Sequence, residues 1–317
     1  MKAFCKILLG AAVITAGFLA ADRLGARLAG HIYAGSRTKL EYAAEGCDEQ
    51  LLIFGYSRAQ HHYAPEILSE ATGMSVYNFG TGGQNIYYHY ALLNAVLAHH
   101  TPETVILELG HIDYMQTPSR FDRDKLGKLA PLYYRNDSVA SVIRLRGPEE
   151  RYKFALSHLY AYNSTAWDIL YGKLFPDSDN STFGHNGYVP IDGQYDGALK
   201  EATDDYTLFD ASKIACLERF IERCREREID LIIAISPAYH IRTGDRVERI
   251  AERIYSRYGI EILDCEQLLA RLEYADCFKD ELHMNRKGAE FYTRLIARRL
   301  KQSGIRNPEE THCERQP

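Results

Sequence analysis

The stretch from Leu51 to Pro65, LLIFGYSRAQHHYAP, constrains the fold more than any other part of the chain. An apolar run leads into Gly-Tyr-Ser and the sequence then becomes polar, which predicts a buried strand, a tight turn and a helix. Ser57 would lie between strand and helix, where free backbone N–H groups and the helix dipole favour a developing anion. Gly55 permits the sharp turn. An ordinary turn in which Ser57 only caps the helix would give the same pattern.

A second stretch, FKDELHMNRKGA at residues 278–289, carries Asp280 and His283 three positions apart, just before a predicted helix. At this spacing a carboxylate can accept a hydrogen bond from one ring nitrogen of the imidazole, while the other nitrogen faces a nucleophile. An Asp-x-x-His pair alone arises by chance in a chain of this size. Together with Ser57, it predicts a serine nucleophile, a histidine base and an aspartate that orients the base.

The rest of the chain alternates between helices and strands, which predicts a three-layer α/β/α sandwich around a mostly parallel five-stranded sheet. Ser57 and the Asp280/His283 loop would both fall at the carboxyl ends of strands, where parallel sheets place their sites. The strands are expected at 51–55, 74–78, 104–109, 230–236 and 261–264, and the helices at 65–72, 86–99, 210–227, 245–258 and from the cap Asn285 to 302.

The two motifs resemble those of the SGNH/GDSL hydrolase superfamily, in particular a bacterial membrane-anchored branch. GYSRAQHHYAP at 55–65 is similar to GSSRAxHHYxP, and DELHMNRKGAEF at 280–291 is similar to DxxHLNxxGAxxF. The resemblance covers about residues 49–300. It implies the flavodoxin-like SGNH hydrolase fold and a serine esterase with Ser57, His283 and Asp280 as its catalytic residues.

The resemblance also implies an oxyanion hole made by the N–H of the nucleophile and by a glycine, for which Gly83 in FGTGGQN is the best match. A third donor in the superfamily is the Asn of Gly-x-Asn-Asp. This chain has Gly-His-Ile-Asp at 110–113, and Ile112 cannot donate. Removing one such donor typically costs about 3 to 4 kcal/mol of transition-state stabilisation. His111, Asn85 or another group is therefore expected to substitute, or activity is low.

Residues 1–30 have the composition of a signal peptide or signal anchor. Lys2 and Lys6 flank an apolar run at 7–21, which as a helix spans roughly 22 Å, less than a ~30 Å hydrocarbon core unless the helix continues. The short length favours cleavage, whereas the resemblance favours a retained anchor, which we expect. The lysines on the amino side then predict a domain outside the cytoplasmic membrane, periplasmic or extracellular.

We expect one SGNH hydrolase-like domain at 45–303 and a polar tail at 304–317. Between the third and fourth strands, residues 115–207 become Tyr-rich and irregular, which indicates an insertion. Its aromatic residues, Trp167 among them, could line a carbohydrate groove or simply pack together. The turn-forming run at 184–190 could lie near the mouth of the site.

Several classes of partner are disfavoured by the composition. The net charge of -5 and pI near 6.2 provide no basic field, so no nucleic acid partner is expected. The chain has no His-Glu-x-x-His or paired cysteine motif, and its seven cysteines are scattered. We therefore expect no metal and no cofactor.

These observations predict acyl transfer at an ester. The expected location and the resemblance together imply the substrate, most simply an O-acetyl group on a cell-envelope or extracellular carbohydrate. Water as the acceptor gives an esterase, and a sugar hydroxyl gives a transferase. Two alternatives remain open. The fold could serve a non-catalytic envelope protein that binds glycan or a partner, or an O-acyltransferase accessory that receives acyl groups from a membrane partner.

Overall fold

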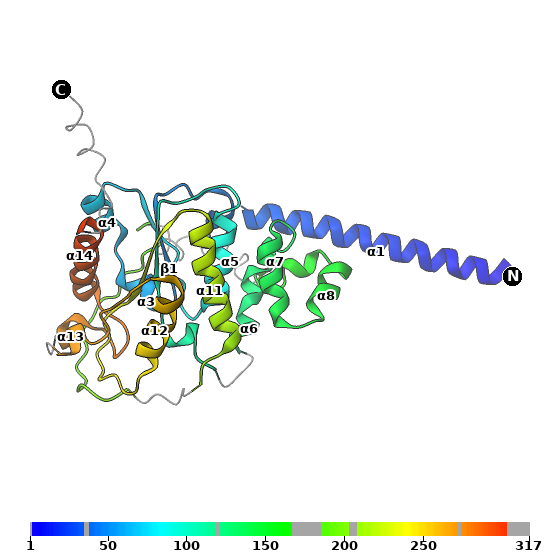
Figure 1. Cartoon of the computed structure of the whole chain (residues 1–317). Coiled ribbons are helices and arrows are strands. Elements are labelled where there is room, and N and C mark those ends of the chain that lie inside the picture. Colours follow the sequence, from blue (N-terminus) through cyan, green and yellow to red (C-terminus); the bar gives the residue numbers. More distant parts are fainter. Residues whose placement is uncertain are drawn as a thin grey trace, which may run out of the picture.

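A computed structural model of the chain describes residues 2–34, 38–117, 121–166, 185–202, 208–271 and 274–302 (Figure 1). Five strands form one sheet in the order β2-β1-β3-β4-β5, and every neighbouring pair is parallel. The strands are β1 (Leu51–Gly55), β2 (Val76–Asn78), β3 (Thr104–Glu108), β4 (Asp230–Ile235) and β5 (Ile262–Asp264). The predicted parallel sheet is confirmed, because the apolar runs of the sequence are the strands.

Helices cover both faces of the sheet, because alternate strand residues point in opposite directions. Leu52 and Phe54 pack against one layer of helices, whereas Leu51 and Ile53 pack against the other. The first layer contains α2 (Lys39–Glu45), α5 (Ile86–Val96), α11 (Ala211–Glu226) and α12 (Arg246–Tyr258); the second contains α3 (Ser57–His62), α4 (Pro65–Thr72), α13 (Leu268–Arg271) and α14 (Arg286–Gln302). The predicted three-layer α/β/α sandwich is therefore confirmed.

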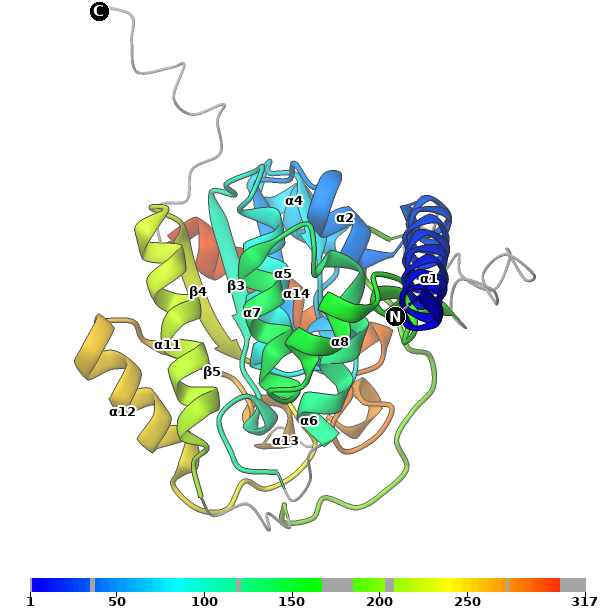
Figure 2. The ribbon, with the colours of Figure 1, turned by 90° about the vertical axis from the view of Figure 1, so that its right-hand side faces the viewer.

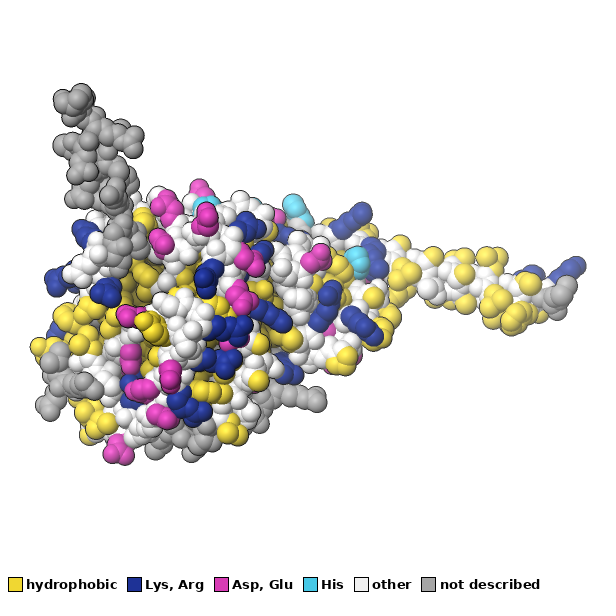
Figure 3. All heavy atoms as spheres, in the orientation of Figure 1, with side chains coloured by type: hydrophobic (Ala, Val, Ile, Leu, Met, Phe, Trp, Pro, Cys, Tyr) yellow, Lys and Arg dark blue, Asp and Glu magenta, His cyan; other side chains and the backbone are white. Residues whose placement is uncertain are grey.

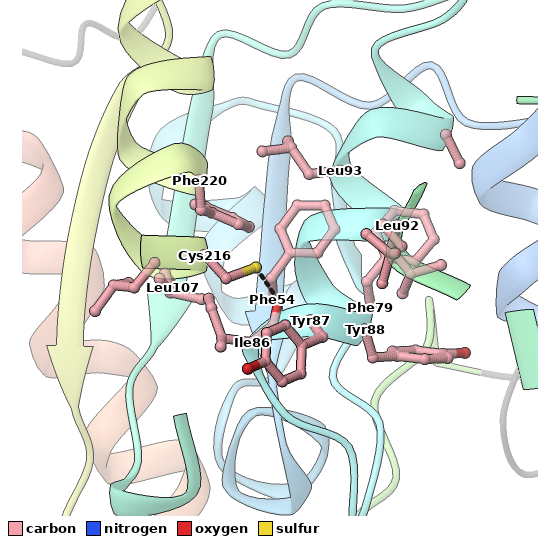
Figure 4. Close-up of a cluster of buried hydrophobic side chains, with 14 of the residues drawn as sticks. Phe54, Phe79, Ile86, Tyr87, Tyr88, Leu92, Leu93, Leu107, Cys216 and Phe220 are labelled. Atoms are coloured by element: carbon pink, nitrogen blue, oxygen red, sulfur yellow. Dashed lines mark hydrogen bonds between the residues drawn. The ribbon is translucent and has the colours of Figure 1, made fainter. Parts of the chain in front are cut away.

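The core of the first layer is rich in aromatic side chains (Figure 4). The Phe54 ring stacks on Phe79 at 5.4 Å between centroids and meets Phe220 of α11 edge-on at 5.8 Å. All three side chains are fully buried, and each contributes about 1.5 to 3 kcal/mol by its removal from water. This packing fixes β1, which ends two residues before Ser57.

The chain between β3 and β4 forms a group of short helices, as the predicted insertion requires. In Figure 1 they lie on one side of the sandwich, next to α5. Their bounds are η1 (His111–Asp113), α6 (Phe121–Asp124), η2 (Lys125–Leu132), α7 (Asp137–Ile143), η3 (Arg144–Arg146), α8 (Glu150–Leu156) and η4 (Leu159–Tyr162). Among its described aromatics, Tyr133 and Phe154 stack at 3.6 Å and Phe154 is fully buried. Trp167 and the tail at 304–317 lie outside the described residues.

Helix α1 (Lys2–Ala34) projects from the domain as a single rod of 33 residues (Figure 1). The helix therefore continues well beyond the predicted apolar run. It is long and apolar enough to cross a membrane, with a mean hydropathy of 2.0 over its best window, although a signal sequence has the same properties. At ~1.5 Å per residue its length of about 50 Å exceeds a hydrocarbon core.

Six cysteines lie among the described residues, and all of them are free thiols. Cys216 and Cys224 share helix α11, and both are buried. The last secondary element before the carboxyl-terminal loop, η6 (Ala275–Cys277), leads directly into the Asp280/His283 motif.

Candidate active site

Ser57 is the first residue of α3 and follows β1 after a single residue, Tyr56. The turn requires Gly55, which has a φ of 143°. A Cβ atom at Gly55 would lie 2.7 Å from the Glu108 carbonyl oxygen and 2.9 Å from Ala59 Cβ, so no larger residue fits. The backbone therefore passes close to β3 and presents Ser57 at the edge of the sheet.

The Asp280/His283 loop places its histidine directly against Ser57. His283 Nε2 lies 2.8 Å from Ser57 Oγ, and His283 Nδ1 lies 3.0 Å from both Asp280 carboxylate oxygens. A ring that donates its Nδ1 hydrogen to Asp280 has its Nε2 lone pair free to accept the Ser57 hydroxyl hydrogen. The structure thus brings together all three side chains that the two sequence motifs predict.

Asp280 is fixed by its own loop as well as by the histidine. Its Oδ1 accepts hydrogen bonds from the backbone N–H groups of Leu282 and His283, both at 2.8 Å. Partial burial raises the pKa of Asp280, but these hydrogen bonds and the nearby His283 outweigh it and hold the pKa below its usual value. The carboxylate is therefore charged at neutral pH and favours a positive charge on the imidazole.

The glycine loop after β2 lies beside Ser57. Thr81 N–H donates to the Gly55 carbonyl at 2.9 Å, and Gly82 N–H donates to Gln60 Oε1 at 2.8 Å. A Cβ on Gly82 would lie 3.9 Å from Ser57 Cβ. The next residue, Gly83, is exposed and has a φ of 71°, and no acceptor is recorded for its N–H within the described chain. Gly83 therefore has an uncommitted donor one residue from the Gly82 contact with Ser57, and its carbonyl accepts a hydrogen bond from Lys125 Nζ at 2.7 Å.

The two other predicted donors have different surroundings. Asn85 is buried and caps α5, since its side-chain oxygen accepts from Tyr87 N–H at 3.1 Å. His111 begins η1 at the carboxyl end of β3, next to Ile112. Burial, together with the positive charges of Arg58 and Arg246, lowers the pKa of His111 to about 4. His111 is therefore neutral at pH 7, and only one of its ring nitrogens carries a hydrogen.

A set of polar side chains that sequence reasoning missed lies beneath the serine, and we call it the buried cluster: Arg58, His62, Glu108, Ser236 and Glu266. Each has a relative exposure below 7%. Arg58 lies 3.2 Å from Glu108 Oε1 and 3.7 Å from Glu266 Oε1. Glu108 also accepts from the Ser236 N–H, from Ser236 Oγ and from the Tyr63 hydroxyl. The sequence signal was a glutamate at the end of the otherwise apolar strand TVILE.

A directed series of hydrogen bonds joins the buried cluster to the Asp280/His283 loop. Met284 N–H donates to His62 Nε2 at 2.9 Å, so the hydrogen of the neutral ring must be on Nδ1. His62 Nδ1 then donates to Ser236 Oγ at 2.7 Å, and Ser236 Oγ donates to Glu108 at 2.7 Å. Burial and the nearby Arg58 hold the pKa of His62 far below its usual value, so the ring stays neutral. Met284 directly follows His283, so this series of hydrogen bonds holds the Asp280/His283 loop in place.

Two residues close to Ser57 in the sequence have structural contacts. The Arg58 guanidinium is buried between Glu108 and Glu266, so it is available neither to a surface acid nor to a substrate carboxylate. His61 joins the turn to the insertion. His61 Nδ1 lies 2.7 Å from the Val189 carbonyl, and Val189 N–H donates to the Gln60 carbonyl.

Lys39 supports the glycine loop from below. It is buried, and its Nζ donates to the carbonyl oxygens of Gly80 at 2.5 Å and Gly187 at 2.6 Å. Burial lowers the pKa of this amine to about 7. Lys39 thereby ties the loop that carries Gly83 to the turn-forming run at 185–190. A lysine in the segment after α1 gave no signal of this contact in the sequence.

Within the described part of the chain, no three His, Cys, Asp or Glu side chains are grouped so as to hold a metal ion. The side chains that meet at Ser57 are a hydroxyl, an imidazole and a carboxylate. This set can transfer an acyl group by itself, since it contains a nucleophile, a base and an orienting anion.

No protein-family model matches the chain, and no curated protein sequence does. Among solved structures, it is similar to a protein described as a lipolytic protein of the G-D-S-L family from Desulfitobacterium hafniense, at 13% identity over 78% of this chain and 98% of that one, with a TM-score of 0.40. A protein described as an acylhydrolase from Bacteroides fragilis overlaps at 12% identity over 86% and 99%, with a TM-score of 0.44. An acetyl xylan esterase overlaps at 14% identity over 80% and 98%, with a TM-score of 0.38. All three TM-scores are below 0.5.

Proposed function

We propose that this protein is a serine esterase whose nucleophile, base and orienting acid are Ser57, His283 and Asp280. The observation that carries the proposal is the contact of His283 with both partners, at 2.8 Å from Ser57 Oγ and 3.0 Å from Asp280. A purely structural role for His283 would not explain why its ring contacts a serine hydroxyl at the carboxyl edge of the sheet. The partly exposed position of His283, at 23% of its side chain, also gives a substrate access to it.

In the first half of the reaction, Ser57 Oγ attacks the ester carbonyl carbon while its hydrogen passes to His283 Nε2. The resulting imidazolium is stabilised by the Asp280 carboxylate on the opposite side of the ring. The tetrahedral intermediate collapses when the bond to the leaving oxygen breaks, and His283 returns the proton to that oxygen. The alcohol departs and the acyl group remains on Ser57.

The negative charge of the intermediate is held by the N–H groups of Ser57 and Gly83, and the free Gly83 N–H supports this role. The amide nitrogen of Asn85 and the neutral ring of His111 are the candidates for the donor that Ile112 cannot supply. Water then attacks the acyl group, with His283 again accepting the proton. The second tetrahedral intermediate collapses when the bond to Ser57 Oγ breaks, and His283 returns its proton to that oxygen, which releases the acid and restores the serine hydroxyl.

For location and substrate, the proposal is a retained membrane anchor and a carbohydrate O-acetyl ester of the cell envelope or the extracellular space. Helix α1 supports the anchor by its length and composition. Lys2 and Lys6 on its amino side favour a domain outside the cytoplasmic membrane. Polysaccharides carrying O-acetyl groups would be the esters accessible from that position.

A second candidate function is a non-catalytic envelope protein that binds glycan or a partner on the same fold. The observation that favours it is Ile112, which lies in η1 at the edge of the sheet and offers no donor to an oxyanion. A folded wild type without acyl-enzyme formation would support this candidate.

The test is labelling of the full-length protein with a fluorophosphonate probe, together with hydrolysis of a small acetyl ester. Wild type should label on Ser57, and Ser57→Ala and His283→Ala should each lose on the order of 10³-fold or more in kcat/KM. The control is Ser256→Ala, because Ser256 is an exposed serine on α12, which contributes no residue to the site. Its labelling and turnover should match wild type.

Two outcomes would contradict the proposal. Labelling that persists in Ser57→Ala would assign the nucleophile elsewhere, and a wild type that melts cooperatively but neither labels nor hydrolyses would favour the binding function. Acetate release from O-acetylated polysaccharide then tests the substrate. Competition between water and an added sugar hydroxyl for the acyl group separates an esterase from a transferase.

A further inference from the structure

The fully exposed part of α1 ends at Asp22, which contacts the insertion. Every residue from Lys2 to Ala21 is exposed, and at ~1.5 Å per residue this stretch measures about 30 Å, the thickness of a hydrocarbon core. Asp22, the next residue, is buried against the insertion. The domain therefore begins where a bilayer core of ordinary thickness would end.

Asp22 fixes the position of the insertion along the helix. Its carboxylate accepts hydrogen bonds from Ser157 Oγ, from His158 N–H at 2.8 Å and from Leu159 N–H at 3.3 Å. Leu159 also lies next to Gly25, three residues further along α1. The segment between α8 and η4 is therefore held at the depth of Asp22.

The surface next to the Asp22 contact carries large apolar side chains that are exposed and so are not part of the core. The side chains of Tyr152, Leu156 and Leu159 are 57%, 70% and 43% exposed. Tyr152 and Leu156 are four residues apart on α8 and so lie on one face of that helix. In Figure 2, which looks toward the α1 side of the domain, α8 lies beside α1.

Basic side chains occur on both α1 and α8. Arg23 and Arg27 lie four residues apart on α1, and the Arg151 guanidinium stacks on the Tyr152 ring at 4.5 Å. Figure 3 shows Lys and Arg side chains gathered where α1 leaves the domain. The nearby Glu150 is buried and its charge is paired with Arg146 and Lys153. Among the acidic residues of α8 and its N-cap, Glu149 is exposed.

We propose that this rim, made of Tyr152, Leu156 and Leu159 with Arg23, Arg27 and Arg151, is a second membrane contact that binds the surface of an anionic bilayer. The inference rests on the proposed anchor and adds to it a contact outside the spanning helix. Tyrosine and leucine suit the boundary between headgroups and acyl chains, and arginine suits lipid phosphates. The continuity of the rim with the bare helix selects a bilayer as its occupant.

The test measures the depth of single tryptophans in the full-length protein. In a Trp167→Phe background, which removes the one native tryptophan, Leu156→Trp probes the rim. Val13→Trp probes α1, and Tyr255→Trp on α12 is the matched exposed control, at 58% exposure. Each variant is reconstituted into vesicles of phosphatidylcholine with about 30% phosphatidylglycerol and with brominated acyl chains as quenchers.

Emission should fall about twofold or more for tryptophans at 13 and 156 and stay unchanged at 255. In addition, Arg151→Glu should weaken quenching at 156 but not at 13. Quenching at 13 without quenching at 156 would overturn the rim, as would equal quenching at 156 and 255. An unquenched but blue-shifted tryptophan at 156 would mean that a protein covers the rim. No quenching at 13 would reject the anchor and the rim together, while leaving the esterase proposal to the labelling experiment.

Discussion

The two groups of polar residues around Ser57 differ in their access to water. In the outer group, Asp280 is 52% exposed and His283 is 23% exposed. In the buried cluster directly beneath it, the side chains of Arg58 and Glu108 are 4% and 0% exposed. In the proposed reaction the outer group exchanges a proton with the substrate, whereas the buried cluster carries charges that are fixed.

The difference is clearest between two histidines that are each held by the same loop. His283 contacts the Asp280 carboxylate through Nδ1 and the Ser57 hydroxyl through Nε2, so Nε2 can accept a proton while Nδ1 keeps its hydrogen. His62 contacts the Met284 N–H and Ser236, inside a site that keeps it neutral. One ring can change its charge, and the other acts as a rigid link. Substitutions in the outer group should therefore lower activity, whereas substitutions in the buried cluster should lower stability or shift the His283 loop.

The largest effect is expected from the matched pair Glu108→Gln and Asp280→Asn. Glu108→Gln leaves Arg58 buried with only the more distant Glu266, so the free energy of unfolding should fall by about 3 to 5 kcal/mol. Asp280→Asn should change stability by less than about 1 kcal/mol, because the side chain is half exposed, yet lower kcat on the order of 10³-fold. Urea unfolding and ester kinetics measure both. Equal losses of stability would show that the two groups do not differ as described.

An intermediate effect is expected in acid. Burial raises the pKa of Glu266, but His240, Arg58 and Arg242 outweigh it and lower the pKa to about 2, from 4.5 in the unfolded chain. The unfolded state therefore binds more protons between these values, so this stabilisation is complete above pH 4.5 and is lost as the pH falls toward 2. Its size is about 3 kcal/mol.

This contribution can be isolated with Glu266→Gln, for which the decline of stability between pH 4.5 and 3 should be shallower than for wild type. Urea midpoints at several pH values measure it. Asp280→Asn is the control from the outer group and should follow wild type more closely. A Glu266→Gln curve parallel to wild type would mean that this carboxylate does not stabilise the fold.

The smallest effect is expected from His62→Gln, which can keep polar contacts but changes their length. The His283 loop should shift slightly, and kcat should fall about tenfold with KM unchanged, because the reacting groups are misplaced while binding is retained. His62→Asn should retain less activity than His62→Gln, because the asparagine side chain is shorter. A raised KM at normal kcat would instead place His62 in substrate binding.

The outer group could be predicted from the sequence because each of its parts is local. Ser57 follows a recognisable strand and turn, and Asp280 and His283 share one loop, so residue type and spacing carry the signal. The strands and the larger helices follow from apolar periodicity in the same way, as with the predicted helix at 65–72, which is α4.

The buried cluster could not be predicted, because its members come from four separate elements. Glu108 ends β3 and Ser236 follows β4, and only the register of the two parallel strands brings them together. The extent of α1 was missed for a similar reason. Its second half, from Arg23 onward, is polar enough to end a membrane span, and it stays in contact with η4 through pairings that are distant in sequence.

The Asp22 contact also bears on the proposed anchor, because it would set the distance between Ser57 and the membrane. A flexible linker of about ten residues would let a domain wander over roughly 15 to 20 Å. A helix held by three hydrogen bonds works instead as a rigid stalk of constant height. With α1 embedded as proposed, Ser57 would reach only those esters that lie within a narrow range of distances from the lipid surface. Position would then select substrates as strictly as the shape of the site.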